Sequence, residues 1–110
     1  MTLVESVYRQ MAGFPREELY GLAAQMRRAA VSIPSNIAEG AGWNSSRELP
    51  QFLGITCGSL AELDTQLELA VRLGYVSAEA ELIEQAQRVG MLVRLLRKSI
   101  RAKLGDGSTE

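Results

Sequence analysis

Apolar residues recur at alternating steps of three and four along most of this chain, which is the period of an amphipathic helix and not that of a strand. Four segments carry the pattern, within residues 4–14, 19–37, 49–70 and 82–100. The third is an unbroken heptad series of Leu49, Leu53, Thr56, Leu60, Leu63, Leu67 and Ala70. The fourth consists of Leu82, Ala86, Val89, Val93, Leu96 and Ile100. The pattern predicts four helices and no sheet.

Turn and cap residues separate the four segments. Pro15 divides the first from the second, whose first turn we expect to contain Glu17 and Glu18. The other boundaries are Gly40 or Gly42, a capping box of Ser45 and Glu48, Gly74, and Ser77 as N-cap of the last helix. Short connections make neighbouring helices antiparallel, so we predict an all-α, antiparallel up-down-up-down four-helix bundle. The predicted domain spans residues 1–104, and we expect the polar residues 105–110 to form a disordered tail.

Pro34 lies inside the second helical segment, where it removes one backbone hydrogen bond and its ring presses on the carbonyl of Ala30. We therefore expect the second helix to be kinked. The polar residues around the proline, Ser32, Ser35, Asn36 and Glu39, have two explanations. They satisfy backbone groups that the proline releases and tie the helix to its neighbours, which we favour, or they bind a ligand.

Composition narrows the functional classes. A length of 110 residues with 46% apolar and 23% charged residues fits a single soluble domain. No apolar run is long enough to span a membrane and the N-terminus has no signal-peptide pattern, so we expect a cytoplasmic protein that does not bind membranes. Cys57 is the one cysteine and histidine is absent, which excludes the usual zinc ligand sets and the commonest general base. We expect no metal, no cofactor and no catalytic site.

The net charge of −1 provides no global attraction to nucleic acid, but charge is unevenly distributed along the last helical segment. Glu79, Glu81 and Glu84 come first, and the segment then contains only bases among its charged residues. This order complements the helix dipole, which is the simpler explanation. The alternative is a basic ridge for RNA phosphates or an acidic protein, made of Arg88, Arg94, Arg97, Lys98 and Arg101.

Several large apolar residues lie off the helical seams. They are Ile55, Leu69, Leu73, Met91, Leu92 and Leu95. Part of this surplus can widen the core stripe, and the rest predicts an apolar surface suited to a subunit interface. Gly54 and Gly58 narrow one side of the third helix, which suggests a close neighbour from the same chain or from another subunit.

Two stretches of the chain carry a more specific signal. One includes Phe14-Pro15 and residues 25–40, QMRRAAVSIPSNIAEG, and the other includes residues 58–63, GSLAEL, and residues 73–75, LGY. Over residues 7–104 the chain resembles the bacterial four-helix-bundle family named after the 23S ribosomal RNA intervening sequence. We expect a structural role for its motif residues Arg28, Ser32, Pro34, Asn36 and Glu39.

The resemblance implies a bundle that assembles as a homo-oligomer, commonly a ring of five, with a poorly defined biochemical role. Similar members include the accessory protein of diversity-generating retroelements, a basic pentamer that binds RNA and its reverse transcriptase. In this chain the first helix is shorter, and Trp43, Asn44 and Cys57 stand where basic residues are common. We predict a non-enzymatic, oligomeric interaction or scaffold protein. The alternatives are an RNA-binding accessory protein that uses the basic ridge and, third, an enzyme with carboxylates at a subunit junction.

Overall fold

The computed structural model describes residues 2–18, 20–42, 48–78 and 80–103, and within these ranges the chain is helical without any strand. The helices are α1 (Thr2–Met11), a 3-10 turn η1 (Arg16–Glu18), α2 (Leu22–Gly42), α3 (Glu48–Arg72) and α4 (Glu81–Lys103). The all-α prediction is confirmed. The predicted capping residue Ser45 and the predicted tail 105–110 lie outside the described residues.

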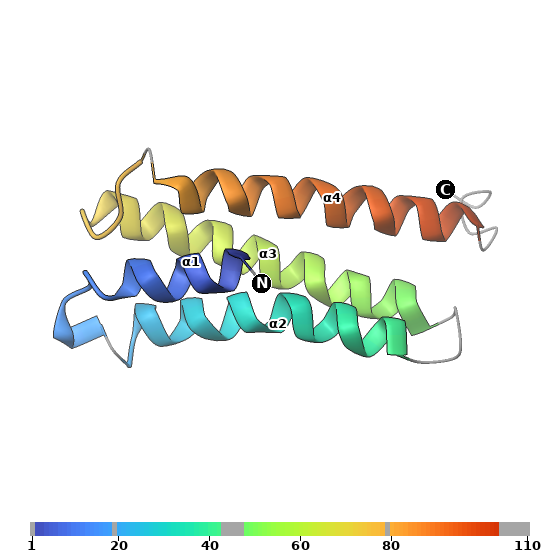
Figure 1. The fold of residues 1–110 in the computed structure, drawn as a ribbon, viewed down its shortest axis with the longest axis horizontal. Helices are drawn as coiled ribbons and strands as arrows, with labels where there is room; N and C mark the ends of the chain where they lie inside the picture. The colour runs from blue at the N-terminus through green and yellow to red at the C-terminus, as the bar shows by residue number, and fades with distance from the viewer. Residues whose placement is uncertain (1, 19, 43–47, 79, 104–110) are drawn as a thin grey trace.

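The four α-helices pack side by side, and each runs back along the one before it (Figure 1). α2 and α3 make the most extensive contact, α4 packs on α3, and α1 packs on both α2 and α4. These contacts are those of a helical bundle. α1 has ten residues whereas α4 has 23, and the N-terminal end of α1 lies near the middle of the bundle's long axis (Figure 1). The described part of α1 therefore lies along only part of the bundle's length (Figure 1).

The core lies on the predicted helical seams. In α3 every seam residue from Leu53 to Ala70 is buried, including Thr56, whose hydroxyl donates to the Phe52 carbonyl at 2.9 Å. Donation to the preceding turn satisfies this hydroxyl without an outside partner, so a threonine can replace an aliphatic residue in the seam. The largest fully buried apolar side chains are Met26, Leu53, Leu60, Leu63, Leu82 and Val7.

Leu96 departs from the predicted seam. The spacing in α4 predicts it to be a core residue, but its side chain is 43% exposed. α1 runs beside the first part of α4 only (Figure 1), and Leu96 lies in the C-terminal half of α4, which spans Glu81–Lys103. The periodicity identified the correct face of α4, but the described part of α1 does not extend to the level of Leu96.

The connection between α1 and α2 is longer than predicted. α1 ends at Met11, and η1 holds Glu17 and Glu18, which the sequence reading placed in the first turn of the second helix. Glu18 nevertheless acts on α2, because its Oε1 accepts a hydrogen bond from the Leu22 amide at 3.2 Å. Its Oε2 accepts a second bond from the Tyr75 hydroxyl at 3.1 Å, which ties this turn to the α3–α4 connection.

Gly74 ends α3 in a left-handed conformation with φ of 81°. The Tyr75 amide donates to the Ala70 carbonyl at 2.8 Å and the Gly74 amide to the Val71 carbonyl at 3.0 Å, which is the Schellman pattern. A side chain at this position would be strained, so the predicted helix end at Gly74 has a clear physical basis. α4 begins at Glu81, four residues after Ser77, and therefore starts later than the N-cap prediction placed it.

Two prolines lie inside helices. Pro50 occupies the first turn of α3, where a missing backbone N–H costs nothing. α2 continues through Pro34 to Gly42, and the bend expected at Pro34 stays a prediction. None of the helices in the described ranges has the length and apolarity needed to cross a bilayer.

Candidate functional site

All six residues of the apolar surplus are solvent-exposed, but they do not lie together. Met91, Leu92 and Leu95 project from the middle of α4 with exposed fractions of 58, 66 and 58%. They lie within about one helical turn of one another, and we call them the α4 apolar face. Leu69 and Leu73 lie at the end of α3, and Ile55 is 14 residues before Leu69, roughly 21 Å along the helix axis. The surplus therefore forms separate exposed groups.

The predicted basic ridge on α4 is partly committed to contacts within the chain. A Cβ built on Gly54 would lie 3.4 Å from Nη2 of Arg97, so the Arg97 guanidinium lies against α3 where glycine leaves room. Nε of Arg97 is buried with no hydrogen-bond partner among the described residues. Arg94 lies over Gly90 of its own helix, with Nη1 3.1 Å from a Cβ built there. Glycine at position 54 therefore has an intrachain explanation, whereas Gly58 leaves open space.

The other three members of the predicted ridge are Arg88, Lys98 and Arg101. Arg88 and Lys98 are exposed and flank the α4 apolar face in the sequence, and Arg101 is half-buried. The exposed surface of α4 therefore combines an apolar centre with bases on either side.

The motif around Pro34 makes contacts within α2 and across to α3. Nδ2 of Asn36 donates to the Ser32 carbonyl at 2.8 Å and to Ser32 Oγ at 2.9 Å. Ser32 Oγ is 2.7 Å from Ser59 Oγ on α3, and either hydroxyl could be the donor. The predicted role of Ser32 and Asn36 in tying α2 to its neighbour is visible in this chain of bonds. Pro34 is half-buried and Glu39 is exposed.

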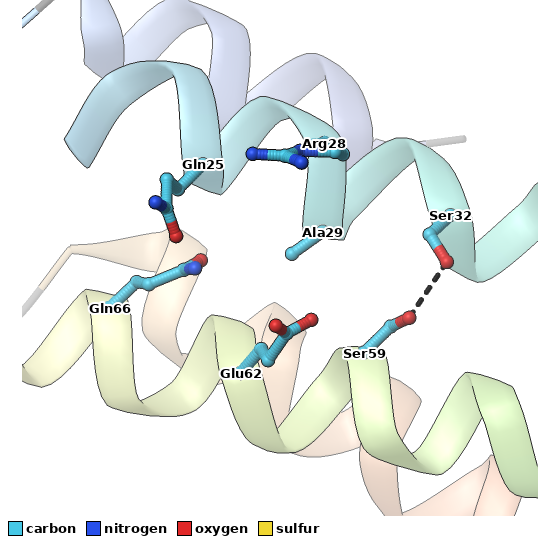
Figure 2. Close-up of a pocket in the computed structure, with 7 residues that line it drawn as sticks. All are labelled: Gln25, Arg28, Ala29, Ser32, Ser59, Glu62 and Gln66. Atoms are coloured by element: carbon cyan, nitrogen blue, oxygen red, sulfur yellow. Dashed lines mark hydrogen bonds between the residues drawn. The ribbon is translucent and has the colours of Figure 1, made fainter. Parts of the chain in front are cut away.

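A polar cleft opens between α2 and α3 beside this motif (Figure 2). Its volume is about 410 Å³, and we define it by its lining residues: Gln25, Arg28, Ala29 and Ser32 from α2, with Ser59, Glu62 and Gln66 from α3. Gln25 and Gln66 lie at one end, the Ser32–Ser59 pair lies at the other, and Ala29 and Glu62 lie between them (Figure 2). Oε1 of Gln66 is buried and accepts no hydrogen bond from the described residues.

This cleft was not predicted from the sequence. The sequence pattern predicted a structural role for Arg28 and indicated no role for Gln25, Glu62 or Gln66. A signal was present, because each helix carries polar residues one turn apart, at 25, 28 and 32 on α2 and at 59, 62 and 66 on α3. Only the pairing register of the two helices brings these series together.

A smaller groove lies between α3 and α4, with a volume of about 240 Å³. Asp64 and Glu68 line it on α3, together with Ile83 and Gln87 on α4. Partial burial raises the pKa of the Asp64 carboxyl, and the nearby Arg94 guanidinium opposes that rise. Among the described residues, no three cysteine, aspartate or glutamate side chains gather closely enough to hold a metal ion.

The fold and these surfaces define an all-α bundle with an exposed apolar helix face and a polar interhelical cleft. The chain belongs to the family of 23S rRNA-intervening sequence proteins, because the family model with that description matches residues 1–95. The matched region contains the whole polar cleft and the α4 apolar face, and it ends before Arg97, Lys98 and Arg101. No curated protein matches the chain.

Proposed function

We propose that this protein is a non-enzymatic, self-assembling bundle that serves as an interaction scaffold. The observation that carries the proposal is the α4 apolar face. Its three large side chains are more than half exposed, although each would gain roughly 1.5–3 kcal/mol from full burial. A cluster of this kind on one side of a small domain is typical of a surface that is covered in an assembly.

The separate apolar groups fit a ring better than a two-fold pair. In a ring each subunit uses two different surfaces, one to contact the subunit ahead and one to contact the subunit behind. The α4 apolar face supplies one such surface, and Leu69 with Leu73 or Ile55 on α3 supplies candidates for the other. The family resemblance adds the expectation that the ring has five members.

Light scattering coupled to size-exclusion chromatography tests this proposal. We expect the wild-type protein to elute as an oligomer and the double variant Leu92→Glu/Leu95→Glu as a monomer, because two buried charges without partners are costly at an interface. Tyr20→Glu is the matched control, since Tyr20 lies in the turn between η1 and α2 and is 94% exposed, so the substitution should leave assembly unchanged. A wild-type monomer at tens of micromolar, well above the dissociation constants of stable interfaces, would refute self-assembly.

A second proposal is that the bases of α4 bind RNA as an accessory function. The observation in its favour is that Arg88 and Lys98 are exposed on the same helix as the α4 apolar face, so assembly would repeat them in every subunit. The packing of Arg97 against Gly54 weighs against the full ridge, because that guanidinium is already partly covered. Retention of structured RNA that fades as salt is raised would support this function.

A further inference from the structure

The polar cleft is built from three successive levels at which residues of α2 and α3 face each other. Gln25 faces Gln66, Arg28 and Ala29 lie opposite Glu62, and Ser32 is bonded to Ser59 (Figure 2). Each level is about one turn from the next on both helices, so the cleft follows the helix–helix seam. Ala29 is buried and has the smallest side chain of the set, which leaves the space between Arg28 and Glu62 open.

One end of the cleft offers a hydrogen-bond acceptor that is not used. Oε1 of Gln66 is buried without a partner among the described residues. A buried carbonyl without a partner destabilises the folded chain, and a ligand N–H group that donates to it would remove this cost. Gln66 therefore favours a ligand with a donor at this end.

The other end offers a hydrogen-bond donor. Ser32 and Ser59 share one hydrogen bond, which uses one of their two hydroxyl protons. Ser32 Oγ also accepts from Asn36 Nδ2, so the pair is held in place from α2. Whichever hydroxyl donates to the other, one O–H proton is left for an acceptor in the cleft.

The middle of the cleft carries one charge of each sign. Arg28 is on α2 and Glu62 is on α3, both with exposed side chains. Arg28 and Glu62 form no ion pair with each other among the described residues, in contrast to Glu5–Arg9 and Glu68–Arg72. A simple anion would be repelled by Glu62 and a simple cation by Arg28, and only a ligand with both charges satisfies both groups.

We propose that the polar cleft binds a small zwitterion of the α-amino acid class. The ligand carboxylate lies between the Arg28 guanidinium and the free O–H of the serine pair, a charge-assisted arrangement. The ligand ammonium donates to the Glu62 carboxylate and to Gln66 Oε1. The substituent on the α-carbon points along an adjoining hollow of about 440 Å³, lined by Gly58, Ala61 and Thr65, whose small side chains leave room for it.

Titration of the full chain with glycine, followed by amide nuclear magnetic resonance, tests this proposal directly. We expect saturable shifts at Ala29, Ser59 and the Gln66 side-chain amide, with a dissociation constant on the order of 1 mM because the cleft is open to solvent. Glycinamide lacks the carboxylate and N-acetylglycine lacks the ammonium. Each should bind at least about tenfold more weakly, the effect of losing roughly 1.4 kcal/mol of charge-assisted bonding.

Matched variants show whether the charges act in the cleft. Arg28→Gln and Glu62→Gln should each weaken glycine binding about tenfold, while the amide spectrum confirms that both variants fold. Arg9→Gln and Glu68→Gln are the controls, since these residues form surface ion pairs away from the cleft, and both should bind glycine like the wild type. Absence of saturable shifts, equal binding of all three compounds, or equal loss in the control variants would overturn the assignment of an amino-acid site to this cleft.

Discussion

α3 and α4 have similar lengths and similar apolar periodicity, but they use their apolar residues differently. The seam of α3 is buried from Leu53 to Ala70. In α4 the seam residues Leu82, Ala86 and Val93 are buried, Val89 is half-buried and Leu96 is 43% exposed. Three more large apolar residues lie on the outer side of the helix. α3 packs between α2 and α4 along its length, whereas α4 has α1 as its second neighbour, and α1 has only ten residues.

The difference between these helices shows what a heptad pattern can and cannot indicate. The pattern fixes which side of a helix is apolar, but burial depends on whether another element extends to that level. α3 therefore stabilises the monomer, and the α4 apolar face remains available for a partner.

Leu60→Ala should produce the largest change. Leu60 is 1% exposed at the centre of the α3 seam, so truncation leaves a cavity and should lower the free energy of unfolding by about 2–5 kcal/mol. Leu92→Ala on α4 is the matched change, and it should cost about 0.5 kcal/mol or less in the isolated subunit. Urea denaturation at low protein concentration measures both values.

The difference in stability between Leu60→Ala and Leu92→Ala should also depend on protein concentration. If the α4 apolar face is covered in an assembly, Leu92→Ala should become more destabilising as protein concentration rises, while the cost of Leu60→Ala stays nearly constant. Equal costs for the two variants at low concentration would show that α4 is buried by the subunit itself, contrary to this account.

Gly40 and Gly58 provide a second and smaller contrast. A Cβ at Gly40 would lie 2.9 Å from Phe52 Cβ and 3.0 Å from Leu49 Cδ1, so Gly40→Ala forces α2 and α3 apart. We expect a net loss of about 1–2 kcal/mol, since overpacking outweighs the better helix propensity of alanine.

Gly58→Ala is the control for that substitution, because a Cβ there has no neighbour within 4 Å. Thermal unfolding should show a gain of about 0.5–1 kcal/mol from helix propensity alone. A loss of oligomer in Gly58→Ala without a loss of monomer stability would instead place this side of α3 at a subunit contact.

Much of the fold could be predicted from the sequence because helical periodicity and helix breakers are local signals. The α3 seam and the helix end at Gly74 are confirmed by burial and by the Schellman bonds. The role of Glu18 could not be predicted from periodicity or helix breakers, because it depends on a 3-10 turn that brings the Glu18 carboxylate to the Leu22 amide. The exposure of Leu96 depends on the extent of α1, which the pattern in α4 does not record.

For the candidate sites too, the sequence indicated features of single helices but not features that depend on how two helices pack together. The exposed apolar residues were found because unpaired hydrophobicity is visible in one helix at a time. The polar cleft was not found, because its two halves come from helices whose relative register is set by tertiary packing. The contact of Arg97 with Gly54 was missed for the same reason, although the glycine itself suggested a close neighbour.

The groove between α3 and α4 gives the smallest predicted effect, and it depends on pH. Partial burial raises the folded-state pKa of Asp64 above its ordinary value of 3.8, against the opposing attraction of Arg94. Ionised Asp64 is therefore a cost to the folded state, fully present above the raised pKa and absent below the ordinary pKa, where both states bind the proton. Asp64→Asn should stabilise the protein at neutral pH by about 0.5 kcal/mol or less, because substitutions at exposed positions rarely change the free energy of unfolding by more than that.

This gain should shrink as pH falls through the raised pKa and disappear below pH 3.8, which urea denaturation across the acidic range can follow. Removing the opposing charge with Arg94→Gln should enlarge the gain from Asp64→Asn, because burial would then act alone. If Asp64→Asn destabilises the protein at neutral pH, the attraction between Asp64 and Arg94 outweighs burial. In that case the two helices are joined across this groove by charge as well as by apolar contact.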